Sequence, residues 1–191
     1  GAGDDPVGRM ADEVAAVGGI AHRVADFEAA AACLSEILKP LQPGSALCWQ
    51  HAVLDRLDLS GLLAELGIAQ LRHAELQGMS AAERRAAMLA AGVGISSVDY
   101  AVAETGSLAV GARPGQERLA SLLPPVHVAI VERSQILPDL FDLFAQLQQA
   151  GLEQLPSNLT LITGPSKTGD IELQLTTGVH GPGVWHVVLI G

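Results

Sequence analysis

The chain has 191 residues, of which 49% are hydrophobic and 17% are charged, and its formal net charge is −10. This length fits one sizeable domain with a substantial core, and the composition excludes disorder of the whole chain. The acidic balance argues against nucleic acid or an anionic membrane as the main partner. No apolar run reaches the roughly 18 residues of a membrane-spanning helix, and no leader pattern is visible, so we expect a cytoplasmic protein.

The first half of the chain alternates helical and strand patterns. Helices are expected at 4–16, 26–38 and 61–66 and from Ser80 to near Gly92, and strands at 19–24, 45–49, 68–72 and 93–98. Asp26 is a favourable N-cap, and Pro40 should end the helix that Asp26 begins. Ser60 can cap the next helix, and Ser80 with Glu83 forms a capping box.

The second half continues the alternation. We expect two short strands around a turn at 99–112, a buried strand at 126–131, a helix from Pro138 to Ala150, strands at 159–163 and 185–190, and a short helix at about 169–175. Strands that alternate with helices predict an α/β sandwich with a largely parallel sheet.

A single carboxylate, Glu104, lies among apolar residues directly before the turn Thr105-Gly106-Ser107. Burial would raise its pKa and would make Glu104 a candidate acid, base or nucleophile. The alternative is a glutamate at a solvated strand edge, hydrogen-bonded to the N–H groups of the turn. The pattern leaves both interpretations open.

A second candidate site begins where the apolar run before Thr163 stops at a Gly-Pro turn. Its candidate ligand-binding residues are Thr163, Gly164, Ser166, Lys167, Thr168 and Asp170. If a helix starts after this turn, its N–H groups and the Lys167 ammonium would attract an anion. The pattern is not a P-loop, because only one glycine precedes Lys167. The alternative is a tight turn in which Asp170 only favours the helix dipole.

A glycine-rich segment follows, in which His180 lies between Gly178 and Gly181. Such glycines indicate positive φ angles or a close approach of the backbone to another group. His180 is a candidate ligand-binding residue, and the alternative is an ordinary loop histidine. No second histidine stands at metal-ligand spacing, so no zinc site is expected. In the polar loop 113–118, an arginine could clamp a carboxylate, or the loop could simply be solvated.

The chain has only two cysteines, Cys33 and Cys48, both in apolar surroundings. We expect two reduced, buried thiols. An Fe–S cluster requires about four thiolates, so this chain cannot hold one alone. No cofactor motif is evident in it.

Several motifs together resemble the LUD domain family, and within it the lactate utilization C group. They are the segments 103–107, 122–127, 155–159, 163–172 and 178–182, and the resemblance covers about residues 92–191. It implies one domain with a three-layer α/β sandwich, similar to the CoA transferase, ribose-5-phosphate isomerase and glucosamine-6-phosphate deaminase group. The first half of the chain is compatible with this fold but carries no motif.

The resemblance also implies a function. The protein would be the non-Fe–S subunit of a bacterial system that oxidises L-lactate to pyruvate, together with A-type and B-type subunits that carry the Fe–S clusters. A small carboxylate or another anion would bind where 104–107 meets 163–170 and 178–182. Lys167 stands where Arg is common in the group, which keeps the cation but removes a bidentate grip.

Two other functions remain open at this point. The chain could be a stand-alone enzyme of the transferase or isomerase type with Glu104 as nucleophile or base. It could also be a ligand-binding or structural subunit without chemistry of its own.

Overall fold

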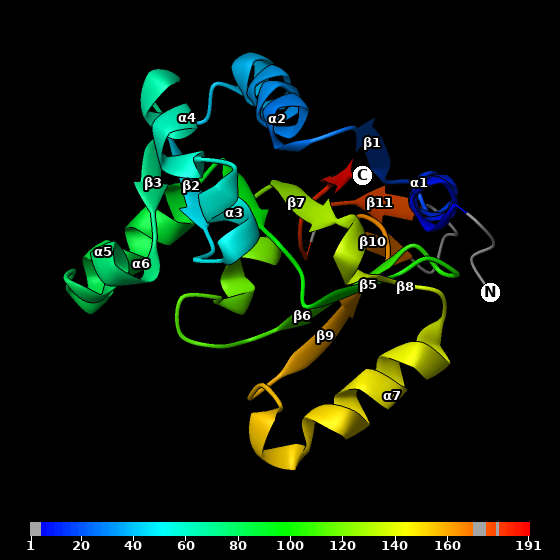
Figure 1. Cartoon of the computed structure of the whole chain (residues 1–191). Helices are drawn as coiled ribbons and strands as arrows, with labels where there is room; N and C mark the ends of the chain where they lie inside the picture. The colour runs from blue at the N-terminus through cyan, green and yellow to red at the C-terminus, as the bar shows by residue number, and fades with distance from the viewer. Residues whose placement is uncertain (1–4, 170–174, 179) are drawn as a thin grey trace.

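Six parallel strands form the main sheet of the protein, in the order β1-β12-β7-β4-β2-β3 (Figure 1). The computed structural model describes residues 5–169, 175–178 and 180–191. The strands are β1 (Ile20–Val24), β2 (Ser45–Cys48), β3 (Ala69–Leu71), β4 (Val93–Ser96), β7 (Val126–Glu132) and β12 (Val184–Ile190). Every neighbouring pair is parallel, which confirms the predicted parallel sheet.

The centre of this sheet is buried on both faces. β4 is buried along its whole length, and β7 is buried from Val126 to Val131, as its continuous apolar run predicts. A 3-10 helix, η1 (Arg118–Ser121), lies directly on β4. At Gly94 a Cβ atom would come within 1.7 Å of the Ala120 carbonyl oxygen. Only glycine therefore allows this close packing.

Helices surround the main sheet. They are α1 (Pro6–Ala16), α2 (Phe27–Leu41), α3 (Ala52–Arg56), α4 (Leu59–Glu65), α5 (His73–Gln77) and α6 (Ala81–Ala90). The predicted caps at Asp26 and Ser80 are confirmed: Asp26 Oδ1 accepts from the Ala29 N–H at 2.8 Å, and Ser80 and Glu83 form the reciprocal capping box. In Figure 1, α2 and α4 lie on the side of the sheet opposite to α7 (Leu140–Ala150).

Some predicted helix boundaries are wrong. α2 continues through Pro40, which donates no hydrogen bond to the preceding turn, and the helix then ends at Gln42 with a left-handed φ of 42°. Asp58, rather than Ser60, caps α4, since its carboxylate accepts from the Gly61 N–H. The short helices α3 and α5 lack the length for a recognisable apolar period.

A second sheet, in the order β8-β5-β6-β9, lies beside the main one. Its strands are β5 (Tyr100–Val102), β6 (Ser107–Gly111), β8 (Ile136–Leu137) and β9 (Leu159–Ile162), and the 3-10 helices η2 (Arg133–Gln135) and η3 (Leu152–Gln154) flank β8 and β9. The hairpin of β5 and β6 confirms the two predicted strands. β9 pairs antiparallel with β6, so it does not belong to the parallel sheet. α7 covers this sheet through Leu143, which packs on Val102 and Ala109.

The prediction of a short helix at about 169–175 is wrong at both ends of this segment, where the structure has strands. β10 (Lys167–Gly169) and β11 (Leu175–Thr177) form an antiparallel ribbon, in which Gly169 pairs with Leu175. Threonines favour strands, and so short a segment has little helical stability of its own. Asp170 and its neighbours up to residue 174 lie outside the described residues. Within the described part of the chain, no helix is both long and apolar enough to cross a membrane.

Candidate functional site

Glu104 lies at the turn of the β5–β6 hairpin, and its side chain is exposed. Its backbone N–H donates to the Pro138 carbonyl oxygen at 3.1 Å. The interpretation of Glu104 as a buried carboxylate is therefore wrong, because its side chain is exposed. The exposure that the alternative of a solvated strand edge predicts is confirmed, whereas no hydrogen bond from the N–H groups of the turn to the Glu104 carboxylate is found among the described residues.

The hydroxyl groups next to this turn form a chain. Thr105 Oγ1 donates to Ser107 Oγ at 2.8 Å, and Ser107 Oγ lies 2.7 Å from Thr163 Oγ1 at the end of β9. Gly106 has a φ of +63°, and a Cβ there would lie 2.7 Å from the Glu13 carbonyl carbon in α1. The structure thus brings the predicted residues 105–107 and Thr163 together, against the first helix.

Lys167 contacts the end of the same helix. Its Nζ donates to the carbonyl oxygen of Val17, the C-cap of α1, at 2.6 Å. Gly164 has a φ of +87°, and a Cβ there would lie 2.8 Å from the same oxygen. A cation at a helix C-terminus complements the helix dipole. The contact gives Lys167 a structural role whether or not an anion also binds there.

Ser166 joins the glycine-rich segment to this group. Its N–H donates to the Pro182 carbonyl oxygen at 2.8 Å, and its own carbonyl oxygen accepts from the Gly178 N–H at 3.0 Å. A Cβ on Gly181 would lie 3.1 Å from the Ser166 Cβ, so the close approach predicted for the glycines is confirmed here. His180 is exposed, and the backbone of Thr168 belongs to β10.

These contacts lie at the amino edge of the parallel sheet. Pro182 and Gly183 immediately precede β12, and the Gly183 N–H donates to the carbonyl oxygen of Pro125, the residue before β7. Ligands of open parallel sheets bind at the opposite edge, where the strands end at their carboxyl termini. The predicted residues were expected near such strand ends, but Thr163 follows a strand of the second sheet.

The carboxyl edge of the main sheet has a topological switch point between β2 and β4. The chain leaves β2 toward β3 on one side, and the next main-sheet strand after β4 is β7 on the other side. Such a point opens a crevice between the two strand ends. His51 follows β2 and Asp99 follows β4, so both lie near this crevice.

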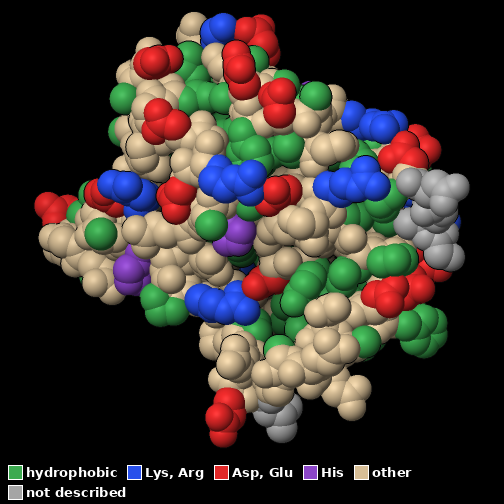
Figure 2. All heavy atoms as spheres, viewed as in Figure 1, with side chains coloured by type: hydrophobic (Ala, Val, Ile, Leu, Met, Phe, Trp, Pro, Cys, Tyr) green, Lys and Arg blue, Asp and Glu red, His purple; other side chains and the backbone are tan. Residues whose placement is uncertain are grey.

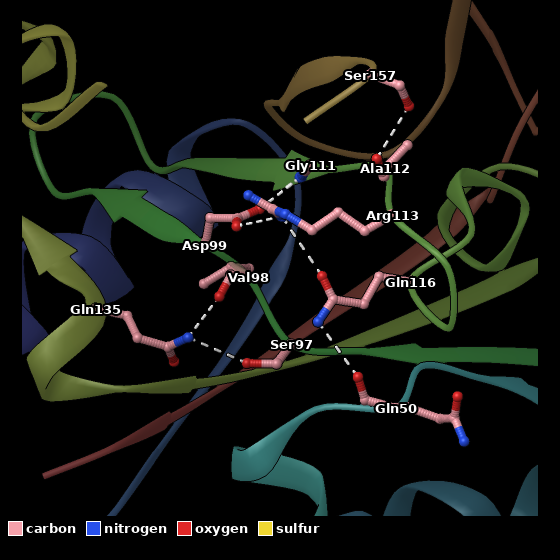
Figure 3. Close-up of polar contacts among 10 residues, drawn as sticks. All are labelled: Gln50, Ser97, Val98, Asp99, Gly111, Ala112, Arg113, Gln116, Gln135 and Ser157. Atoms are coloured by element: carbon pink, nitrogen blue, oxygen red, sulfur yellow. Dashed lines mark hydrogen bonds and ion pairs between the residues drawn. The ribbon is translucent and has the colours of Figure 1, made fainter. Parts of the chain in front are cut away.

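An arginine from another loop meets Asp99 there (Figure 3). Arg113 Nη1 donates to Asp99 Oδ1 at 2.6 Å, and Asp99 Oδ2 accepts from the Gly111 N–H at 2.5 Å. Arg113 Nη1 also lies 3.5 Å from Gln116 Oε1. Every hydrogen bond found for this guanidinium among the described residues uses Nη1. Its Nε and Nη2 donors therefore remain available to a ligand.

The loop that carries Arg113 is fixed to the end of β2. The Gln50 N–H donates to the Gly115 carbonyl oxygen at 2.7 Å. Figure 3 shows the second contact, in which Gln116 Nε2 donates to the Gln50 carbonyl oxygen at 3.2 Å. Trp49 Nε1 donates to the Glu117 carbonyl oxygen at 2.9 Å. Glu117 itself is held by His73 and by the Gly115 N–H. The position of Arg113 is thus set by the sheet.

His51 is a half-buried neighbour of this ion pair. Its Nδ1 accepts from the Val53 N–H at 3.2 Å and so caps α3. Burial lowers the pKa of His51; Asp99 and Asp55 oppose this shift, and Arg113 adds to it. The ring is therefore neutral near pH 7, with its proton on Nε2 as a hydrogen-bond donor. His51 and Arg113 both offer donors to a carboxylate.

Two hollows lie near these strand ends, and His51 lines neither of them. One of about 240 Å³ lies over the ends of β2 and β3 and is lined by Trp49, Gln50, Gln70 and Arg72 among others. The other, of about 100 Å³, is lined by Asp99, Tyr100 and Arg113 on one side and by leucines of α7 and β9 on the other. Both are large enough for a small organic acid.

The described residues contain no cluster of side chains that could bind a metal ion or an Fe–S cluster. No group of three or more His, Cys, Asp or Glu side chains there could hold a metal ion. Burial raises the pKa of the Cys48 thiol to about 12, which opposes thiolate formation, and Cys33 is the other cysteine. Because a cluster requires about four thiolates, the donor set does not fit one.

Sequence reasoning missed His51 and Asp99 and left Arg113 undecided between a clamp and a solvated loop. A usable signal was present, because His51 and Asp99 each stand just after a correctly predicted strand. The partner of Asp99 comes from a loop whose path only the folded chain reveals.

Comparisons with known proteins agree with the fold. The LUD domain family model matches residues 7–190. A lactate utilization protein C of Halalkalibacterium halodurans is 30% identical over 151 residues, which are 78% of this chain and 64% of that protein. A protein of the same name from Macrococcus caseolyticus is 44% identical over 95 residues, 48% of this chain and 41% of that protein. The matches thus span less than two thirds of these relatives.

A solved structure shares the architecture. The crystal structure of a DUF162 family protein from Deinococcus radiodurans superposes with a TM-score of 0.65, covering 98% of this chain and 97% of that chain. The two sequences are 19% identical, so this likeness shows the fold alone.

Proposed function

The chain belongs to the LUD domain family, and from this premise we propose that it takes part in lactate utilization. Its relatives named lactate utilization protein C support this role. In the proposal, the chain is the cytoplasmic subunit without an Fe–S cluster of a system that oxidises L-lactate to pyruvate. The electrons pass to Fe–S clusters of A-type and B-type partner subunits.

One observation carries the proposed site: Arg113 is held by Asp99 at the switch point, beside a neutral His51. A guanidinium recognises a carboxylate through two parallel N–H donors, and Nε with Nη2 forms such a pair. The Nε2–H of His51 adds a donor from the end of β2. We infer that this crevice binds the carboxylate of lactate or pyruvate and orients it.

The alternative of a stand-alone transferase or isomerase loses its main support. That activity requires a buried, reactive Glu104, and the side chain is exposed. The amino-edge group around Ser166 and Lys167 remains a second candidate for an anion site, and the experiment below distinguishes the two.

The test measures ligand binding and growth. Calorimetric titration of the purified chain with L-lactate and with pyruvate should show binding, and Arg113→Ala should weaken it at least tenfold. Arg113→Lys should restore the charge but little of the affinity, because it lacks the fork. Arg118→Ala, at the exposed start of η1 directly after this loop, is the matched control and should bind as the wild type does.

The same variants are then introduced into a strain of the source organism that lacks its own copy of the gene. The wild-type chain should restore growth on L-lactate, and Arg113→Ala should not. If the double variant Glu104→Ala/Lys167→Ala abolishes binding and growth while Arg113→Ala retains both, the amino-edge group is the site. If the wild-type chain neither binds these acids nor restores growth, the proposed function is wrong.

A further inference from the structure

Phenylalanine is rare in this chain, and most of it is on the surface of one helix. The chain has three phenylalanines. On α7, Phe141 is 85% exposed and Phe144 is 61% exposed. The third, Phe27, packs under the guanidinium of Arg56 at 3.9 Å. Large exposed aromatic side chains that lie together mark interaction surfaces.

These two side chains are not needed to attach α7 to the protein. The inner face of the helix buries Leu143, and Leu140 and Leu147 pack beside it on the second sheet. Phe141 and Phe144 therefore belong to the outer part of the helix.

The charged side chains within residues 134–166 all have one sign, and the neighbouring Arg113 belongs to another loop, beside Leu147. No Lys or Arg occurs between Arg133 and Lys167, whereas Asp139, Asp142 and Glu153 do. Figure 2 shows Lys and Arg side chains across the middle and top of this face, and hydrophobic, acidic and uncharged ones in the lower part, where Figure 1 places α7. A complementary partner therefore has an apolar pocket bordered by basic side chains.

A second copy of the same chain fits this surface poorly. Two copies that met through α7 would bring Asp139 and Asp142 of each toward those of the other, and each chain has a net charge of −10. Like charges across an interface oppose association. The charge pattern thus favours a different protein.

We propose that Phe141 and Phe144 anchor this chain in an apolar, basic-bordered pocket of a different protein. The identity of this partner rests on the proposed function: it is one of the Fe–S subunits of the lactate-oxidising system. The docking surface consists of Phe141 and Phe144, which stand three positions apart on the outer part of α7, and Asp142 lies at its border. The hollow at Arg113 instead adjoins Leu147 of the same helix.

The experiment uses the purified full chain and the purified A-type and B-type subunits of the same organism. Biolayer interferometry should show that the wild type binds one of them. Phe141→Ser/Phe144→Ser should weaken this binding at least about 30-fold, as expected for aromatic anchors. Leu89→Ser on α6, where Leu89 is 60% exposed, is the matched control and should leave binding unchanged. Asp142→Lys should also weaken binding, and added salt should do the same for the wild type.

The outcomes separate the two proposals. If the wild type binds and the double phenylalanine variant binds equally well, the docking surface is wrong and the subunit role stands. If the wild type binds neither subunit, the subunit role fails too. If light scattering shows a wild-type dimer that the double variant loses, the occupant is a second copy and the proposal is overturned. Circular dichroism and urea midpoints confirm that the variants fold.

Discussion

The Lys167 ammonium donates a hydrogen bond of 2.6 Å to the carbonyl oxygen of Val17, 150 positions earlier in the chain. Val17 caps the C-terminus of α1, where carbonyl groups lack helical partners. Gly18 and Gly164, with φ angles of +92° and +87°, allow the two segments to come this close. Lys167, which belongs to the motif segment 163–172, thus stabilises the C-terminal end of α1.

We therefore expect Lys167→Met to destabilise the fold. Loss of a cation at a helix C-terminus should lower the free energy of unfolding by about 0.5–1 kcal/mol. Lys39→Met is the control, because Lys39 pairs with Glu36 on the exposed surface and should change stability by less than about 0.5 kcal/mol. Urea denaturation measures both. A Lys167→Met variant that is as stable as the wild type but has lost anion binding would show that Lys167 serves the ligand instead.

Gly106 is expected to tolerate no side chain. Its φ of +63° alone should make Gly106→Ala cost about 1–2 kcal/mol, and overlap with the α1 backbone at Glu13 should add about 1–3 kcal/mol. Gly67→Ala isolates the first effect, because Gly67 has a φ of +68° and no heavy atom would lie within 4 Å of its Cβ. Thermal or urea unfolding should place Gly106→Ala clearly below Gly67→Ala. Equal losses would mean that α1 moves aside without cost.

The hydroxyl contact between Ser107 and Thr163 should be measurable as a coupling energy. Ser107 is buried, and its Oγ lies 2.7 Å from Thr163 Oγ1. In a double-mutant cycle with Ser107→Ala and Thr163→Val, we expect a coupling of about 0.5–1.5 kcal/mol in the free energy of unfolding. Additive losses would mean that the two hydroxyls stabilise the fold independently, each through other partners.

The sequence was sufficient to predict most of the main sheet, because its strands are short apolar runs between recognisable helix signals. The helix starts at Asp26 and Ser80 could also be predicted from the sequence, because an N-cap depends only on residues within one turn. The segment at 169–175 shows where local patterns fail. Its two described ends, Gly169 and Leu175, pair antiparallel with each other, and such pairing involves residues that are not neighbours in the sequence.

The candidate site was harder to predict for the same reason. The proximity of residues 105–107 to Thr163 followed from the grouped motifs, but the sheet to which β9 belongs did not. Asp99 and Arg113 lie 14 positions apart and meet because the β5–β6 hairpin brings Gly111 opposite Asp99, while Gly115 and Gln116 are fixed to Gln50 after β2. Side-chain exposure, which decided the case of Glu104, also depends on neighbours that are distant in the sequence.

Buried His127 should make the protein sensitive to mild acid. Its ring is fully buried, with Nε2 at 2.9 Å from Ser96 Oγ, and burial lowers its pKa from 6.5 to about 4. Between these two pH values the unfolded chain binds a proton that the folded chain does not, so stability falls as the pH falls from 6.5 toward 4. The half-buried His186, whose pKa burial and His22 also lower to about 4, contributes in the same direction but less, because solvent reaches it.

From pH 7.5 to pH 5, we expect His127 alone to lower the free energy of unfolding by about 2 kcal/mol. Urea titrations at both pH values measure the loss, and His127→Gln should reduce it by about that amount while lowering stability at pH 7.5. Carboxylates with a lowered pKa, such as Glu75 beside Arg72, act below their ordinary value of 4.5 and so do not account for a loss above pH 5. If the variant and the wild type lose equal stability over this range, His127 is already protonated in the folded state or reaches solvent.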